Sequence, residues 1–209
     1  GEIEDQFIPT SEEYAGKVSL YGPRAWYDES KRFSEILCQS FGQIYNMPIK
    51  IVRCFNVYGP GMREDDASVI PHFISDSFRN STMNIYGDDS RTRSYCYISD
   101  AIEACLKVLF TNANTEAVNV GNPELEISLS KLALMIQNMI DRDIKIKQHP
   151  PLDLIYEKAN PRRRCPNISK LKKLTNFEPR YTLEQGLART LGWYQEKDIS
   201  ANKSVKEAA

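Results

Sequence analysis

Apolar side chains recur at helical spacing between residues 24 and 46, at steps of seven, four, four and three. These residues are Trp26, Phe33, Leu37, Phe41 and Ile44. This spacing places them on one stripe of a long helix. Further helices are predicted in the same way around residues 70–78, 102–109, 132–140 and 183–194.

Short apolar runs alternate with these helices. The run Ile49–Val57 reads as a buried strand that the glycines and proline at 59–61 terminate. Other short strands are predicted at 83–86, 94–98, 117–120 and 144–146. Alternating helices and strands predict an α/β protein with some parallel sheet.

Two residue pairs have the spacing of a helix capping box. Asp100 with Glu103 and Thr182 with Gln185 are each three residues apart at the start of a predicted helix. Outside these elements, we expect an ordered or semi-ordered loop over residues 1–22, an irregular stretch over 149–166 and a polar tail over 199–209.

The composition limits the classes of partner. The chain has 209 residues, 41% of them hydrophobic, which is enough for one buried domain or parts of two. The net charge of −1 argues against binding to nucleic acid or an anionic membrane. Five cysteines without a Cys-x-x-Cys pair and two histidines predict no metal site. Without an apolar run long enough for a membrane span, or an opening signal peptide, the expected location is cytoplasmic.

Tyr27 and Lys31 are the first candidate for chemistry. They are four residues apart on the first predicted helix, so both side chains leave the same face. An ammonium close to a phenol favours the phenolate, and such a pair can exchange a proton near neutral pH. The spacing alone also occurs by chance in a chain with 11 tyrosines, so the context has to decide.

That context is a series of ordered motifs. They are Gly22-Pro-Arg-Ala-Trp-Tyr27-Asp-Glu-Ser-Lys31-Arg32, Arg53-Cys-Phe-Asn56-Val-Tyr58-Gly59-Pro60, Ile85-Tyr86-Gly87, Arg91-Thr-Arg93-Ser-Tyr95, Tyr97-Ile-Ser-Asp100, Asn119-Val-Gly121-Asn122-Pro123, Arg164-Cys-Pro166-Asn167-Ile168 and Phe177-Glu178-Pro179. Nearly the whole chain thereby resembles the extended short-chain dehydrogenase/reductase family. Within that family the chain looks most like the NAD-dependent nucleotide-sugar epimerases and dehydratases, and closest to the UDP-glucuronate decarboxylase branch.

The resemblance implies roles for individual residues. Tyr27 would be the catalytic acid/base at the sugar 4-hydroxyl, and Lys31 would bind the nicotinamide ribose of NAD beside it. Asn56 and Arg93 would bind the sugar diphosphate, and Tyr86 would lie near the nucleobase. For Asn56 a plain turn asparagine, and for Arg93 a solvated surface arginine, are the alternatives.

Arg164 carries the expectation of decarboxylation. The resemblance implies that it lies near the C5 end of the sugar, where it would steady a carboxylate or supply a proton after carbon dioxide leaves. The neighbouring arginines at 162 and 163 have no such implied role and are expected to form a solvated basic run. Asn167, Asp88-Asp89, Ser68 and the long segment 149–163 depart from the family pattern and put the identity of the sugar in doubt.

The family's glycine-rich dinucleotide turn does not occur among the ten glycines. We therefore expect the C-terminal part of a larger enzyme. Residues 1–62 would be the end of an NAD-binding Rossmann domain, with 94–112 packing back onto it. Residues 63–93 and 113–198 would form a smaller α/β substrate domain.

The expected activity is conversion of UDP-glucuronate to UDP-xylose through a 4-keto intermediate, by a homodimer that retains NAD. A nucleotide-sugar 4,6-dehydratase or 4-epimerase is the alternative of the same class. The alternative of another class is a non-catalytic fragment that binds nucleotide sugar or dimerises.

Overall fold

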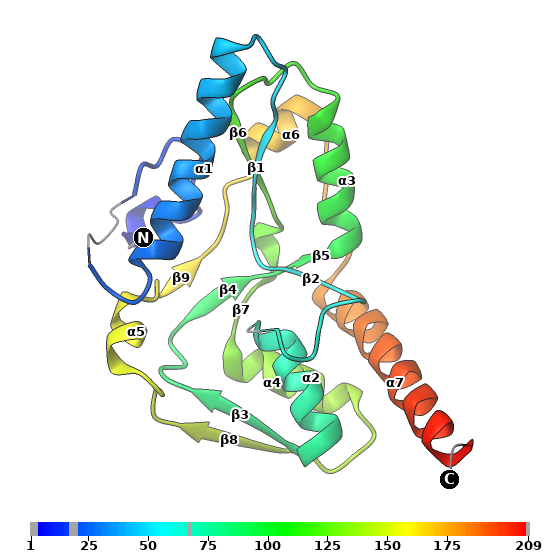
Figure 1. Ribbon diagram of the computed structural model, residues 1–209. Coiled ribbons are helices and arrows are strands. Elements are labelled where there is room, and N and C mark those ends of the chain that lie inside the picture. Colours follow the sequence, from blue (N-terminus) through cyan, green and yellow to red (C-terminus); the bar gives the residue numbers. More distant parts are fainter. Residues whose placement is uncertain (1–3, 17–20, 67, 208–209) are drawn as a thin grey trace.

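The computed structural model describes residues 4–16, 21–66 and 68–207 and shows an α/β fold (Figure 1). The helices are α1 (Ala25–Ile44), α2 (Val69–Asn80), α3 (Ile98–Leu109), α4 (Leu129–Met139), α5 (Leu154–Ala159), α6 (Ser169–Thr175) and α7 (Leu183–Glu207), with 3-10 turns η1 (Asp5–Phe7) and η2 (Pro123–Leu125). The strands are β1 (Ile51–Cys54), β2 (Val57–Tyr58), β3 (Thr82–Tyr86), β4 (Thr92–Ser94), β5 (Cys96–Tyr97), β6 (Ala117–Val120), β7 (Glu126–Ser128), β8 (Lys145–His149) and β9 (Arg163–Arg164).

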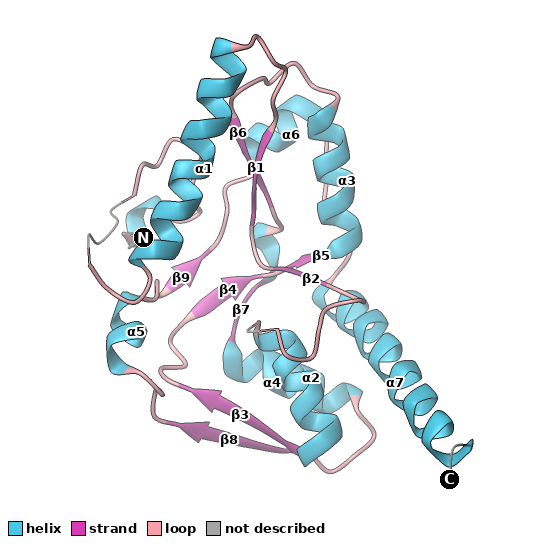
Figure 2. Cartoon of the chain, viewed as in Figure 1, coloured by secondary structure: helices cyan, strands magenta, loops and turns pink. Residues whose placement is uncertain are grey.

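Parallel pairs predominate among these strands, as the alternating pattern predicts. β1 pairs with β6, β2 with β5, β3 with β8 and β4 with β9, all in parallel, whereas β7 runs antiparallel to β4. The small sheets follow one another through the molecule, and helices cover them (Figure 2).

The first hydrophobic core lies around β1 and β6, which α1 flanks on one side and α3 with α6 on the other (Figure 1). Val118 and Val120 of β6 are fully buried here against Val108 of α3 and Leu171 of α6. Both β6 and α6 belong to the segment 113–198, expected in the substrate domain. They pack instead in the first core, together with β1 and α3.

The second core surrounds β3 and β8, with α2, α4 and the start of α7 packed against them. Tyr58 joins this core at the end of β2 and donates its hydroxyl to the carbonyl of Leu183 at 3.3 Å. Gly186 is required beside it, because a Cβ at that position would lie 2.0 Å from the Tyr58 hydroxyl oxygen. Tyr58 thus fixes α7 to the sheets.

One predicted capping box is confirmed and the other is wrong. Thr182 and Gln185 exchange side-chain-to-backbone hydrogen bonds at 3.1 and 3.2 Å where α7 begins. Asp100 instead lies inside α3, fully buried, and accepts hydrogen bonds from the amides of Arg180 and Tyr181, both at 3.1 Å. Its carboxylate ties two distant segments together rather than capping its own helix.

Two further expectations need correction. The stretch 149–166, predicted to be irregular, contains α5 and β9, since Asp153 caps α5 by accepting from the amides of Ile155 and Tyr156. The tail expected from residue 199 begins as helix, because α7 continues to Glu207.

The apolar stripe of α1 is on the surface. The predicted helix is confirmed, but Trp26 is 74% exposed, Phe33 59% and Ile44 73%, and Gly42 is the one residue of this helix that is buried. A helix with this face uncovered is typical of an element that packs against another chain or domain.

Candidate functional site

A cavity of about 320 Å³ is lined by residues of the second core, such as Tyr58 and Ile70, and by Arg24 just before α1 and Arg164 of β9. Four of the six predicted site residues line it: Asn56, Tyr86, Arg93 and Arg164. Four lining arginines, Arg24, Arg91, Arg93 and Arg164, face two lining carboxylates, Asp88 and Glu157. The cavity therefore has an excess of positive charge, which suits an anionic ligand.

Asn56 lies between β1 and β2 with a left-handed backbone, at φ 39°. Its side-chain amide donates to the carbonyl of Ser94 at 2.7 Å, and its own carbonyl accepts from the amide of Cys96 at 3.2 Å. These bonds fix Asn56 at the carboxyl end of a parallel strand, where α/β proteins bind ligands.

Tyr86 ends β3 and stacks on His149, its register partner at the end of β8. The ring centroids are 5.1 Å apart and the ring planes differ by 25°. His149 is held in turn, because its Nε2 lies 2.9 Å from Oδ1 of Asn84. Tyr86 therefore has a supported inner face, while 43% of the residue remains exposed.

Arg93 is held by the loop that precedes β9. Its guanidinium donates to the carbonyls of Arg162 and Pro161, at 3.1 and 2.8 Å, and to Oδ1 of Asn160 at 3.1 Å. Burial, with the nearby charge of Arg164, lowers the pKa of Arg93 to about 10. Arg93 is thus no solvated surface arginine: it positions this loop at the cavity wall.

Arg164, in β9, lies at the same wall. No hydrogen bond or ion pair to its side chain is formed within the part of the chain that the structure describes. Burial and the charge of Arg24 lower the pKa of Arg164, while Asp28, Tyr156 and Tyr27 act in the opposite sense. A partly buried guanidinium without a partner among these described residues is available for an anion that enters the cavity.

Tyr27 and Lys31 lie next to this cavity without lining it. Nζ of Lys31 is 5.6 Å from the centre of the Tyr27 ring, so the two side chains adjoin on α1 as their spacing predicts. The guanidinium carbon of Arg24, a lining residue, is 5.3 Å from the same ring. Tyr27 therefore stands beside the arginine-rich end of the cavity, with 43% of the residue exposed.

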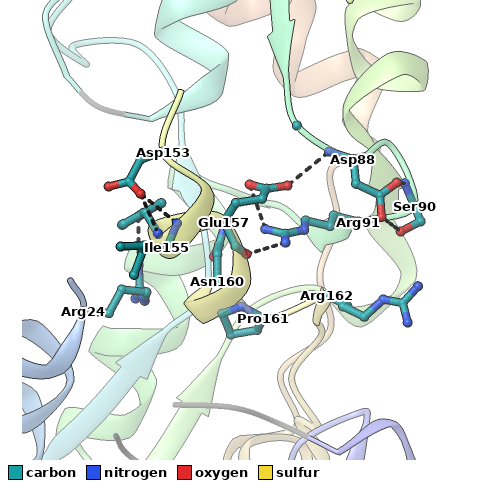
Figure 3. Close-up of polar contacts among 12 residues, drawn as sticks. Arg24, Asp88, Ser90, Arg91, Asp153, Ile155, Glu157, Asn160, Pro161 and Arg162 are labelled. Atoms are coloured by element: carbon teal, nitrogen blue, oxygen red, sulfur yellow. Dashed lines mark hydrogen bonds and ion pairs between the residues drawn. The ribbon is translucent and has the colours of Figure 1, made fainter. Parts of the chain in front are cut away.

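Helix α5 supplies residues that sequence reasoning missed, namely Tyr156 and Glu157, together with Asn160 just after it. Figure 3 shows how this helix is attached. Glu157 forms an ion pair with Nη1 of Arg91 at 3.1 Å and accepts a hydrogen bond from the amide of Asp88 at 3.1 Å. Two features of the sequence could have pointed to these residues: the pair Asp88-Asp89 and the long segment 149–163. Both differ from the family pattern, and the structure brings them into contact where Glu157 binds the amide of Asp88.

Arg163 and Arg162 have structural contacts of different kinds. Arg163 forms two hydrogen bonds to Glu126 across the sheet, at 2.9 and 2.7 Å, so it is not part of a solvated basic run. Arg162 is exposed and lines a neighbouring pocket rather than the candidate cavity, while its carbonyl accepts a hydrogen bond from Arg93.

Neither a metal site nor a membrane span is evident in the described residues. No group of three or more His, Cys, Asp or Glu side chains among them could hold a metal ion. None of the helices that they form is long and apolar enough to cross a bilayer.

Among curated proteins, UDP-glucuronic acid decarboxylase 6 of Arabidopsis thaliana is 36% identical over 181 residues, which are 86% of this chain and 50% of that protein. UDP-glucuronic acid decarboxylase 1 of the same plant is 34% identical over 195 residues, 93% of this chain and 43% of that protein. The chain thus spans about half the length of the curated relatives it matches.

Solved structures show the same fold. A UDP-glucuronic acid 4-epimerase mutant from Bacillus cereus, in complex with UDP-4-deoxy-4-fluoro-glucuronic acid and NAD, matches with a TM-score of 0.74 and 26% identity over 88% of this chain and 58% of that one. The model of the NAD dependent epimerase/dehydratase family matches residues 2–121. The chain belongs to the NAD dependent epimerase/dehydratase family, with the Rossmann-type α/β fold of its sugar-modifying members.

Proposed function

We propose that this chain carries the substrate-binding half of an NAD-dependent enzyme that decarboxylates UDP-glucuronate to UDP-xylose. The observation that carries the proposal is Arg164, a partly buried guanidinium that has no partner among the residues the structure describes, in the same cavity as Asn56 and Tyr86 and close to Tyr27. Relatives named UDP-glucuronic acid decarboxylase, at 34–36% identity, agree with it.

Each predicted residue has a role in this proposal. Tyr27 takes the proton of the sugar 4-hydroxyl, and Lys31 orients the phenol and contacts the cofactor ribose. Arg164 binds the C5 carboxylate. Asn56 and Arg93 face the diphosphate, and Tyr86 offers its exposed face to the nucleobase, since a supported aromatic ring is a good stacking surface.

The residues present fit one end of an NAD molecule. Tyr27 and Lys31 adjoin on an exposed face of α1, so both can reach a nicotinamide ribose placed against that face. NAD, when bound, supplies reversible hydride acceptance at the sugar C4. No glycine-rich dinucleotide turn occurs in the printed sequence, so the pyrophosphate contacts of NAD are not assigned to this chain.

Oxidation at C4 explains why a carboxylate at C5 would be lost. A ketone at C4 makes the acid a β-keto acid, and the electron pair of the breaking carbon–carbon bond passes into the ketone as carbon dioxide leaves. Tyr27 holds the proton near the C4 oxygen, and Arg164 orients the departing group until it leaves. The resulting enolate would then take a proton at C5, and the hydride would return to C4 as Tyr27 gives its proton back to the C4 oxygen, which completes UDP-xylose.

A 4-epimerase acting on the same UDP-sugar is the second candidate. The Bacillus cereus structure, titled a UDP-glucuronic acid 4-epimerase, supports it at 26% identity. In that reaction Tyr27 and Lys31 keep their roles, and Arg164 binds the carboxylate without its loss. A 4,6-dehydratase would place no carboxylate against Arg164, and a non-catalytic module would bind UDP-sugar without turnover.

The assembly we propose is a cytoplasmic homodimer. The exposed apolar stripe of α1, which includes Trp26, Phe33 and Leu37, supports a helix-to-helix interface between two copies. We also retain the division into an NAD-binding unit and a substrate unit, with β6 and α6 placed on the NAD-binding side of the boundary.

Product analysis tests the proposed function. The whole enzyme that contains this chain is incubated with NAD and UDP-glucuronate, and the nucleotide sugars are identified by proton NMR. UDP-xylose is expected. UDP-galacturonate would instead establish the 4-epimerase, and UDP binding without any turnover would establish the non-catalytic module.

A further inference from the structure

Arg24 occupies an unusual position between two aromatic rings. Its guanidinium carbon is 5.3 Å from the centre of the Tyr27 ring and 5.7 Å from that of Tyr156. Its Nη1 donates to the Tyr156 hydroxyl at 3.0 Å. Arg24 thereby joins the start of the catalytic helix α1 to α5, although the two residues are 132 positions apart in the chain.

The charge of Arg24 is only partly offset. Its nearest carboxylate is Asp28, one turn along α1, at 3.4 Å from Nη2. Its Nε is buried and has no hydrogen-bond partner among the residues described. The one bond to Asp28 therefore leaves part of the hydrogen-bonding capacity of the Arg24 guanidinium unused. Arg24 lines the cavity together with Arg164 and Tyr156.

We propose that Arg24 and Tyr156 form, beside Arg164, the part of the cavity that selects a sugar with a carboxylate at C5. The inference rests on the proposed function and adds two residues to it. Two guanidinium groups and one phenol can surround a carboxylate with charge-assisted hydrogen bonds from different directions. A neutral hydroxymethyl group would leave these donors unpaired, and unpaired buried donors are costly.

Helix α5 positions Tyr156 for this selection of the carboxylate. Tyr156 reaches Arg24 because α5 is attached on its other side, where Glu157 pairs with Arg91 and with the amide of Asp88 (Figure 3). The residues that attach the helix and the residue that faces the sugar are therefore adjacent in sequence. Helix α5 lies in the segment 149–163, which is longer than the family pattern, and it completes the anion site.

The test compares the affinities for two ligands that differ at C5. Dissociation constants for UDP-glucuronate and UDP-glucose are measured by calorimetry with the whole enzyme and NAD, in a Tyr27→Phe background that binds the sugars without turning them over. The protein should prefer UDP-glucuronate by about tenfold or more, the value expected for hydrogen bonds to a charged group. In Arg24→Gln the preference should fall about tenfold, with the affinity for UDP-glucose unchanged, and Arg24→Lys should restore part of it.

Two further variants complete the test. Tyr156→Phe keeps the ring and removes the hydroxyl that holds Arg24, so it should reduce the same preference by a smaller factor; it also serves if Arg24→Gln fails to fold. Arg162→Gln, at a position that lines the neighbouring pocket rather than the candidate cavity, is the control and should keep the preference.

The failures are distinguishable. If the protein binds neither UDP-sugar, the proposed function and this inference both fail. If the protein prefers UDP-glucuronate and Arg24→Gln and Tyr156→Phe keep that preference, or weaken both ligands equally, Arg24 and Tyr156 only hold α5 in place. In that case this inference is overturned while the proposed function stands.

Discussion

The carboxylate of Glu157 lies directly against the backbone of Gly87. A Cβ added to Gly87 would be 2.4 Å from Oε1 of Glu157, and Gly87 has a φ of +88°. Gly87 thus adopts a backbone conformation that favours glycine, and its missing side chain leaves the space that the Glu157 carboxylate of α5 occupies.

Gly87→Ala should therefore push the Glu157 carboxylate away from Arg91 and weaken the attachment of α5. The positive φ alone costs about 1 kcal/mol, and moving Glu157 away from Arg91 should add roughly 1–2 kcal/mol. Gly61→Ala is the matched control, because Gly61 has a φ of +89° with nothing within 4 Å of its added Cβ. Chemical denaturation should show that Gly87→Ala lowers the free energy of unfolding more than Gly61→Ala does. An equal decrease in the two variants would show that Glu157 does not hold α5.

Tyr27→Phe should abolish turnover while sparing binding. Removal of a positioned acid/base lowers kcat by roughly 10²–10⁴-fold, and the ring that remains still packs beside Arg24. Steady-state kinetics and UDP-sugar titration measure the two effects separately. Tyr45→Phe, at the exposed end of α1, is the control and should leave kcat unchanged.

Asp100→Ala should destabilise the fold without touching the cavity. The buried carboxylate holds the amides of Arg180 and Tyr181, so its removal leaves two donors unpaired, at a cost of about 2–3 kcal/mol. Urea denaturation is the measurement, with the exposed Asp141→Ala as control. If Asp100→Ala lowers the free energy of unfolding no more than Asp141→Ala does, Asp100 does not link α3 to the segment that precedes α7.

The ion pair between Glu126 and Arg163 should make stability depend on pH. Hydrogen bonding to Arg163 lowers the pKa of Glu126 below its ordinary value of 4.5. Because the pKa is lower in the folded state, the pair stabilises the protein above pH 4.5 and loses this effect as the pH falls through the folded value.

The variant that tests this pair is Glu126→Gln. It should be less stable than the parent at pH 7 by at most about 1 kcal/mol, since the pair is partly exposed. The difference should shrink as the pH falls below 4.5. A difference that is the same at pH 7 and pH 3 would contradict a charge effect.

Much of the fold could be predicted because its elements carry local signals. The strand 117–120 and the box formed by Thr182 and Gln185 depend on residues a few positions apart, and both are confirmed. Asp100 shows the limit of such signals. Its spacing to Glu103 imitates a cap, but its partners lie 80 and 81 residues further along the chain.

The cavity could be predicted only in part. Asn56, Tyr86, Arg93 and Arg164 were inferred from motifs, and the structure brings all four to one cavity. Tyr156 belongs to none of the motifs. Its place at the cavity depends on a hydrogen bond with Arg24, which is 132 residues away in the sequence and comes close only in the folded chain.

The most direct test of the account follows the carboxyl carbon of the sugar. UDP-glucuronate labelled with carbon-13 at C6 is incubated with NAD and the whole enzyme that contains this chain, and labelled carbon dioxide is measured by mass spectrometry. The account predicts release of labelled carbon dioxide in proportion to the UDP-xylose formed, and its loss in Arg164→Ala. No labelled carbon dioxide from UDP-glucuronate, alongside turnover of UDP-glucose or UDP-galactose, would contradict it.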